Sequence, residues 1–139
     1  MDRVVITIKG SQKGPDGQVE KVNLMFKGRY TCKGSKHYLR YDDRKLVPKE
    51  IVSTTIKLSE EEMVILRHGA VETEQRFLLG QKTRAEYHTP YGLMELVMST
   101  RLLTVDFQAE SGEARLQYSM DANGSLVGDY DLKIRVVPA

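Results

Sequence analysis

The chain has 139 residues, of which 40% are hydrophobic and 29% charged, and its formal net charge is +2. This composition excludes a disordered or fibrous chain and is typical of one globular domain, which we expect to span residues 1–139. No apolar run approaches the roughly 20 residues of a membrane-spanning helix, and the opening MDRVVITIKG lacks a secretory pattern. Cys32 is the only cysteine, so no internal disulfide can form, and we expect a cytoplasmic protein without a membrane partner.

Positive charge is concentrated in the first part of the chain. Residues 1–50 contain 12 Lys and Arg against 6 Asp and Glu, whereas residues 51–139 contain 9 against 13. Such asymmetry can mark a surface for nucleic acid or for an acidic protein. In one small domain it more often reflects an uneven solvated face, which is the interpretation that we favour.

Alternation of apolar and polar residues, the pattern of half-buried β-strands, runs through most of the chain. In chain order, it predicts strands at about residues 3–9, 18–31, 36–42, 50–58, 62–68, 71–79, 81–89, 90–99, 101–109, 112–122 and 126–137. The last of these, within LVGDYDLKIRVV, is the clearest. Its predicted buried face consists of Leu126, Tyr130, Leu132, Ile134 and Val136.

Short turn signals separate the predicted strands. The Asn123-Gly124 pair is the strongest of them, because both residues tolerate the positive φ that a two-residue hairpin turn needs. Connections this short join antiparallel neighbours, since a parallel crossover needs a dozen or more residues. Ser59 and Glu62 match a helix capping box, but the apolar run that follows ends at Gly69 and predicts at most one short helical turn.

About ten strands with one apolar face each must bury those faces, either in two stacked sheets or in one closed sheet. Closure is favoured because a long meander leaves unprotected edges unless its first and last strands pair. We therefore predict an all-β fold, a single antiparallel up-and-down β-barrel, with a β-sandwich as the alternative.

The stretch VILRHGAVETEQRF, residues 64–77, poses a register problem, because a slip of one residue exchanges the two faces of a strand. A two-residue turn after Arg67 would place that residue outside. A three-residue loop would place it inside with Met63 and Ile65, where the guanidinium must find partners. Gln75 shares the face of Phe77 under either register. We favour the inward position of Arg67; the alternative is that Arg67 and Gln75 only satisfy backbone groups at the barrel rim.

The sequence contains no pattern typical of catalysis or metal binding. We predict no metal site and no cofactor, because the histidines lie on separate segments without a thiolate cluster. Cys32 is interpreted as a small buried apolar group, and no nucleophile elbow or phosphate loop is present. The histidines in question are His37, His68 and His88.

Asp42 and Asp43 form the most obvious carboxylate pair, in a context typical of a loop. Acid–base catalysis would need one desolvated carboxylate, whereas these two are interpreted as solvated. We therefore predict no catalytic residues, and an enzymatic role ranks last among the hypotheses.

Residues 27–45, KGRYTCKGSKHYLRYDDRK, combine basic and aromatic residues, as do β-surfaces that bind single-stranded nucleic acid. Tyr30 is predicted to point inward, however, and Tyr38 and Tyr41 cannot share one strand face. A continuous stacking platform is therefore disfavoured, and a nucleic-acid partner with it. Leu93 and Val97, predicted on the outer face, leave a homodimer open.

Several segments together resemble the YwiB-like family of uncharacterised bacterial proteins. The likeness lies in VILRHGAVETEQRFLLG, in Tyr87, in YGLMEL at residues 91–96 and in ARLQYSM at residues 114–120. The resemblance implies a lipocalin-like, calycin-type β-barrel in a bacterial cytoplasm. It implies no activity and no catalytic residues, and the family pattern has Ser or Asn where this chain has His68.

We expect a non-catalytic binding module that holds a small, partly apolar or anionic ligand in the barrel mouth. Bulky aromatic residues that fill the interior completely would remove this hypothesis. The alternative is a structural or interaction protein, either a homodimer or a partner of acidic protein or RNA. The candidate ligand-binding residues are Arg67, Gln75, Phe77, Tyr87 and Tyr118.

Overall fold

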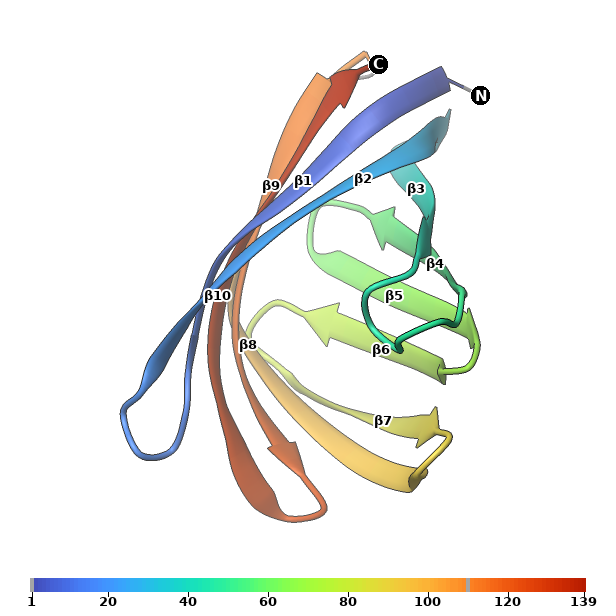
Figure 1. Ribbon diagram of the computed structural model, residues 1–139. Helices are drawn as coiled ribbons and strands as arrows, with labels where there is room; N and C mark the ends of the chain where they lie inside the picture. The colour runs from blue at the N-terminus through green and yellow to red at the C-terminus, as the bar shows by residue number, and fades with distance from the viewer. Residues whose placement is uncertain (1, 110) are drawn as a thin grey trace.

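Ten β-strands close into one antiparallel barrel in the computed structural model, which describes residues 2–109 and 111–139 (Figure 1). Each strand pairs with its sequence neighbours, and β1 also pairs with β10, which closes the sheet. The predicted all-β, up-and-down barrel is therefore confirmed, and the sandwich alternative is wrong. The strands are β1 (Asp2–Lys13), β2 (Val19–Lys33), β3 (Lys36–Asp43), β4 (Val52–Leu58), β5 (Glu62–Gly69), β6 (Glu72–Leu78), β7 (Lys82–Thr89), β8 (Gly92–Gln108), β9 (Ser111–Ala122) and β10 (Ser125–Pro138).

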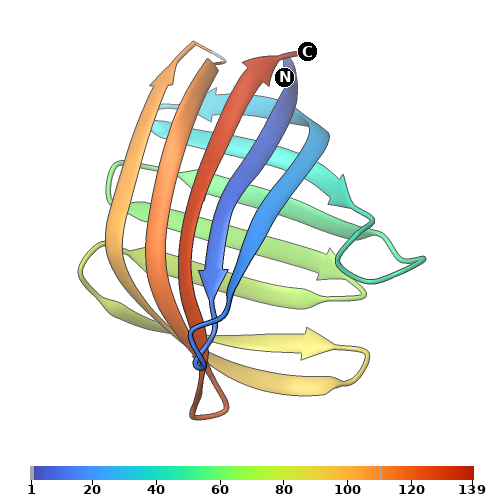
Figure 2. The same cartoon turned by 60° about the vertical axis from the view of Figure 1, so that its left-hand side comes forward.

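The barrel has two unequal walls. The long strands β1, β2, β8, β9 and β10 form one curved wall, and the short strands β3 to β7 cross them at a steep angle in the other (Figures 1 and 2). Strand β8 has 17 residues, whereas β4 and β6 have 7 each. The long strands therefore extend well past the short wall, and their hairpin ends project at the lower side of Figure 1.

One long strand, β8, replaces the two strands predicted at residues 90–99 and 101–109. The pairing of β8 with β9 shifts by one residue between Thr100 and Leu102. Thr100 and Leu103 are both buried on the inner face, which reverses the alternation along the strand. Such a bulge leaves the ladder intact but interrupts the period-two pattern, which is why the sequence indicated a break.

A second irregularity changes the predicted face of β10. Tyr130, Ile134 and the residues between them keep the predicted alternation, with Ile134 buried. The pairing of β10 with β9 shifts between Leu126 and Gly128, and Leu126 is exposed, so its predicted burial is wrong. The preceding turn is as predicted, since Asn123 and Gly124 have φ of 50° and 84° and connect paired strands.

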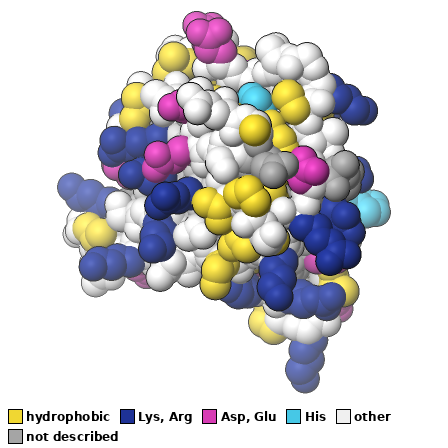
Figure 3. Space-filling view, turned by 90° about the horizontal axis from the view of Figure 1, so that it is seen from above, with side chains coloured by type: hydrophobic (Ala, Val, Ile, Leu, Met, Phe, Trp, Pro, Cys, Tyr) yellow, Lys and Arg dark blue, Asp and Glu magenta, His cyan; other side chains and the backbone are white. Residues whose placement is uncertain are grey.

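The outer surface carries most of the charge. Seen from above, Lys and Arg side chains gather in several groups around the outside of the barrel (Figure 3). Cys32 is also exposed, because it lies near the end of β2, where the hairpin to β3 leaves the barrel wall. The interpretation of Cys32 as a buried apolar group is therefore wrong.

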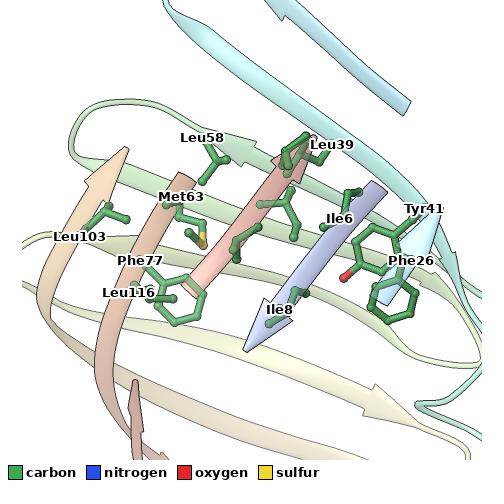
Figure 4. Packing of buried hydrophobic residues seen from close by; sticks show 14 of the residues in the cluster. Ile6, Ile8, Phe26, Leu39, Tyr41, Leu58, Met63, Phe77, Leu103 and Leu116 are labelled. Atoms are coloured by element: carbon green, nitrogen blue, oxygen red, sulfur yellow. The ribbon is translucent and has the colours of Figure 1, made fainter. Parts of the chain in front are cut away.

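The hydrophobic core fills one end of the barrel, which we call the packed end. Ile6, Leu39 and Leu58 point toward one another there from three different strands (Figure 4). Tyr30, His37 and Phe107 stack nearby, with the His37 and Phe107 ring centroids 4.7 Å apart. The Tyr30 hydroxyl and His37 Nδ1 are 2.7 Å apart in a hydrogen bond. Large apolar side chains thus hold the two walls together at this end.

The described residues contain no helix, in keeping with the prediction of at most one short helical turn. In particular, they include no helical segment with the length and apolar character that crossing a membrane requires.

Candidate functional site

The other end of the barrel, which we call the hollow end, contains a cavity of about 550 Å³. This volume lies within the range of pockets that hold small molecules. Bulky aromatic residues do not fill the barrel interior completely, because Tyr118 and Tyr130 line the cavity and Phe107 packs at the packed end. The wall is largely apolar and includes Ile8, Val22, Leu24, Ile56, Met63, Ile65, Met94, Leu96, Leu116, Met120, Ala122, Val127, Leu132 and Ile134.

Arg67 lines this cavity, on the inward face that we favoured from the sequence. Strand β5 pairs with β6 so that Ile65 lies opposite Gln75 and Arg67 opposite Thr73. Arg67 therefore lies on the same inward face that a three-residue loop would give it. The observed connection between β5 and β6 is two residues longer than that loop, however, and it includes Val71. Val71 is itself buried, which explains why the chain lengthens the connection there. The face was therefore predicted correctly, and the register was not.

The Arg67 guanidinium is half-buried and only partly satisfied. Its Nη1 donates to Gln75 Oε1 at 3.4 Å, while its Nε is buried without a hydrogen-bond partner. Among the described residues, no carboxylate oxygen lies within 4.0 Å of this side chain. A cation desolvated without a counter-ion is costly, and a bound anion would lower that cost.

Tyr41 lies against Arg67 and was not among the predicted site residues. Burial raises the pKa of Tyr41 to about 12, although the Arg67 cation and a hydrogen bond from it act in the opposite direction. The phenol therefore stays neutral at physiological pH and acts only as a hydrogen-bonding group. Alternation along β3 places Leu39, Tyr41 and Asp43 on one face, a signal that could have identified Tyr41.

Asp43 is buried and lines the cavity, so its interpretation as a solvated loop residue is wrong. Its Oδ1 accepts hydrogen bonds from the backbone N–H groups of Lys45 and Leu46, at 2.8 and 3.0 Å. The carboxylate therefore caps the connection after β3 and holds that loop at the cavity edge.

Of the remaining predicted residues, two line the cavity and one lies behind the cavity wall. Tyr87 and Tyr118 line the cavity, whereas Phe77 does not. Phe77 is fully buried, and its ring packs against Tyr118 with centroids 4.7 Å apart. Tyr118 stacks in turn on Tyr130 at 4.7 Å, and burial raises the pKa of both phenols. Phe77 thus supports the wall from behind and does not reach the cavity.

The cavity wall combines a few polar and charged groups with its apolar side chains. Gln12, Gln75 and Tyr87 supply polar side chains, Arg67 supplies a positive charge and Asp43 a negative one. In the part of the chain that the structure describes, no three His, Cys, Asp or Glu side chains are placed to hold a metal ion. His68 and His88 are exposed and lie beside Glu72 and Glu86 on the outer face.

Comparison with known proteins points to one family. Residues 6–134 match the model of a domain of unknown function, DUF1934. The chain is similar to the uncharacterised β-barrel protein YwiB of Bacillus subtilis (strain 168), with 36% identity over 105 residues, 76% of this chain and 72% of YwiB. The crystal structure of the Bacillus subtilis ywiB protein superposes with a TM-score of 0.89 at 29% identity, covering 99% of this chain and 92% of that one.

Proposed function

This chain belongs to the DUF1934 family, and we propose that it is a non-catalytic binding module whose barrel holds a small, partly apolar molecule with an anionic group. The observation that carries the proposal is the half-buried Arg67 in a largely apolar cavity, with an unpartnered Nε and no carboxylate within 4.0 Å among the described residues. A guest that places its anion at Arg67 would satisfy this donor and bury its apolar part against the wall.

The dimensions of the cavity set the size of the guest. A volume of about 550 Å³ suits a molecule of drug-like size rather than a peptide. Gln75 and Tyr41 flank the guanidinium and would orient a carboxylate, sulfonate or similar group. In this proposal the protein acts as a lipocalin-like carrier in a bacterial cytoplasm, where an exposed free Cys32 would remain reduced.

The test uses two fluorescent probes of similar shape, the anionic anilinonaphthalene sulfonate and the uncharged phenylnaphthylamine. We expect Arg67→Gln to weaken binding of the sulfonate by about 10- to 100-fold, because it removes a charged hydrogen bond. Binding of the uncharged probe should change little. Arg67→Lys should retain part of the affinity, and Arg84→Gln, which removes a charge from the outer face of β7, should change neither affinity.

Near-ultraviolet circular dichroism of each variant checks that its packing is native, because the sulfonate probe also binds molten states. If natively packed Arg67→Gln binds the sulfonate as tightly as the original protein, Arg67 does not hold the anion. If the original protein binds neither probe, the cavity is not a ligand site.

A further inference from the structure

Three arginines lie side by side on the outer face of β1, β2 and β3. Arg3 is directly opposite Arg29 in the β1–β2 ladder, and Arg29 is directly opposite Arg40 in the β2–β3 ladder. All three side chains are exposed. Since paired strands are about 4.8 Å apart, the row spans about 10 Å across the barrel wall. Like charges placed directly opposite each other repel, so this arrangement does not serve the stability of the sheet.

The row lies in a surface groove that continues into a second one. The first groove, of about 670 Å³, contains the three arginines and Lys27, and the second, of about 370 Å³, adds Arg44 and Lys45. Lys27 and Asp42 line both grooves. We call the six cations the basic track: Arg3, Lys27, Arg29, Arg40, Arg44 and Lys45.

Cations outnumber acidic side chains along the basic track. Asp42 is the only acidic side chain among the described residues that line either groove. Within the described parts of the chain, none of the six cations forms an ion pair. A further groove adjoins Arg40 on its other side, and it is lined by the acidic residues Glu72 and Glu74. The basic track therefore ends at Arg40 on that side. The basic track contains six of the twelve Lys and Arg residues of positions 1–50.

From this juxtaposition we infer that the basic track binds the phosphate backbone of a single-stranded nucleic acid. Arginine presents a planar fork of donors that matches phosphate oxygens, and a row of such forks suits successive phosphates on one strand. A groove that follows one backbone fits a single strand better than a wide, rigid duplex.

The contacts would be made to the backbone and not to the bases. The rings of Tyr30 and Tyr41 are buried on the inner face, so they offer no stacking platform, as the sequence indicated. The sequence disfavoured a nucleic-acid partner on the ground that no stacking platform is present, but contacts to phosphates need no such platform. Binding through phosphates alone predicts little dependence on base sequence and a strong dependence on salt.

The test compares two double variants that remove the same charge from different places. Arg29→Gln with Arg40→Gln removes two cations from the basic track, and Lys82→Gln with Arg84→Gln removes two exposed cations from β7. A fluorescein-labelled oligouridylate is titrated with each protein, and anisotropy is recorded from about 50 to 200 mM salt. Urea unfolding of both variants verifies that they are folded.

We expect the basic-track variant to bind the oligouridylate at least tenfold more weakly at the lowest salt, and the β7 variant to change less than twofold. The slope of log K against log salt should fall in magnitude by about 1.4 for the basic-track variant, because two phosphate contacts are lost. Binding of anilinonaphthalene sulfonate should stay unchanged, which separates this surface from the cavity.

Equal weakening by both double variants would overturn the inference, because net charge alone would then explain binding. Failure of the original protein to bind the oligouridylate at the lowest salt would overturn it as well. An oligoglutamate peptide provides a last comparison. If it displaces the oligouridylate at an equal concentration of negative charge, and if its own binding is weakened equally by the Arg29 and Arg40 substitutions, the partner is an acidic protein and not a nucleic acid.

Discussion

His37 shows how one residue at the packed end makes stability depend on pH. Burial lowers the pKa of the imidazole from its ordinary value of 6.5, because the charged form is desolvated between neighbouring rings. The unfolded chain therefore binds more protons than the folded protein just below pH 6.5. The free energy of unfolding should fall as the pH falls from 6.5 toward the lowered pKa, and then level off.

Urea unfolding of each protein at several pH values between about 7.5 and 5 checks this prediction. His37→Gln should remove this part of the pH dependence, since glutamine does not titrate. His88→Gln, which changes an exposed histidine on β7, should leave it in place. A pH profile of His37→Gln identical to that of the original protein would show that another group is responsible.

Single residues were predictable wherever the strand pattern was regular. Gln75 and Phe77 were placed inside because their strand alternates without interruption, and both are buried. Cys32 and Leu126 were misplaced because each lies beside a hairpin end or a bulge, where alternation stops deciding which side chain is covered. Asp43 was misjudged because the predicted strand ended at residue 42, so the alternation of Leu39 and Tyr41 was not extended to it.

At the level of elements, the contact between β6 and β7 is the weakest part of the barrel wall. Register pairs join these strands only at Glu72 with His88 and at Thr73 with Tyr87. Beyond that point, the Thr73 hydroxyl donates to the Glu86 carbonyl oxygen at 2.8 Å, and the Thr83 hydroxyl donates to the Arg76 carbonyl oxygen. Side-chain hydroxyls therefore replace part of the backbone ladder.

We call the contact between β6 and β7 the seam. We expect backbone amide hydrogens of residues 74–78 and 82–86 that face the seam to exchange with solvent faster than amide hydrogens in the β9–β10 ladder. Fewer backbone hydrogen bonds must break to expose them, so opening requires only local unfolding. Hydrogen exchange followed by nuclear magnetic resonance measures each amide separately. Seam amides as protected as those between β9 and β10 would contradict the prediction.

Elements were predictable to the extent that local sequence determines them. The Asn123-Gly124 hairpin was recognised because the turn type demands those residues. The single strand β8 was divided in two because a bulge at Thr100 resembles a break in a one-dimensional pattern. The length of the connection after Arg67 depends on how Val71 packs in the assembled barrel, which no local pattern records.

Across the whole molecule, packing is divided unequally between the two ends. Met98 is fully buried in the core, whereas Met94, four residues earlier on β8, lines the cavity. Met98→Ala should cost about 2–5 kcal/mol of unfolding free energy, because it removes a close-packed side chain and leaves a void. Met94→Ala should cost well under half as much, since its side chain already borders open space.

Urea unfolding of the two variants provides the comparison, and their shared residue type and strand make each the control for the other. Equal losses would show that the hollow end is as tightly packed as the packed end. A larger loss for Met94→Ala would reverse the assignment of the two ends.

Closure of the sheet was predictable from short turns and period-two alternation, since both are properties of the chain. A space in the barrel mouth was expected, but its volume was not predictable, because it depends on how far two walls of different length separate. The basic track was visible only as a charge imbalance, and pairing of β1, β2 and β3 was needed to align its arginines.

One end of the barrel is closed by the stacked rings of Tyr30, His37 and Phe107. A molecule bound in the cavity, as proposed, would have to enter and leave through the opening at the hollow end. Entry and departure would then be governed by the hairpins that frame that opening, among them the turn at Asn123-Gly124. If the cavity binds a ligand as proposed, the rate of its release would therefore depend on how these hairpins move.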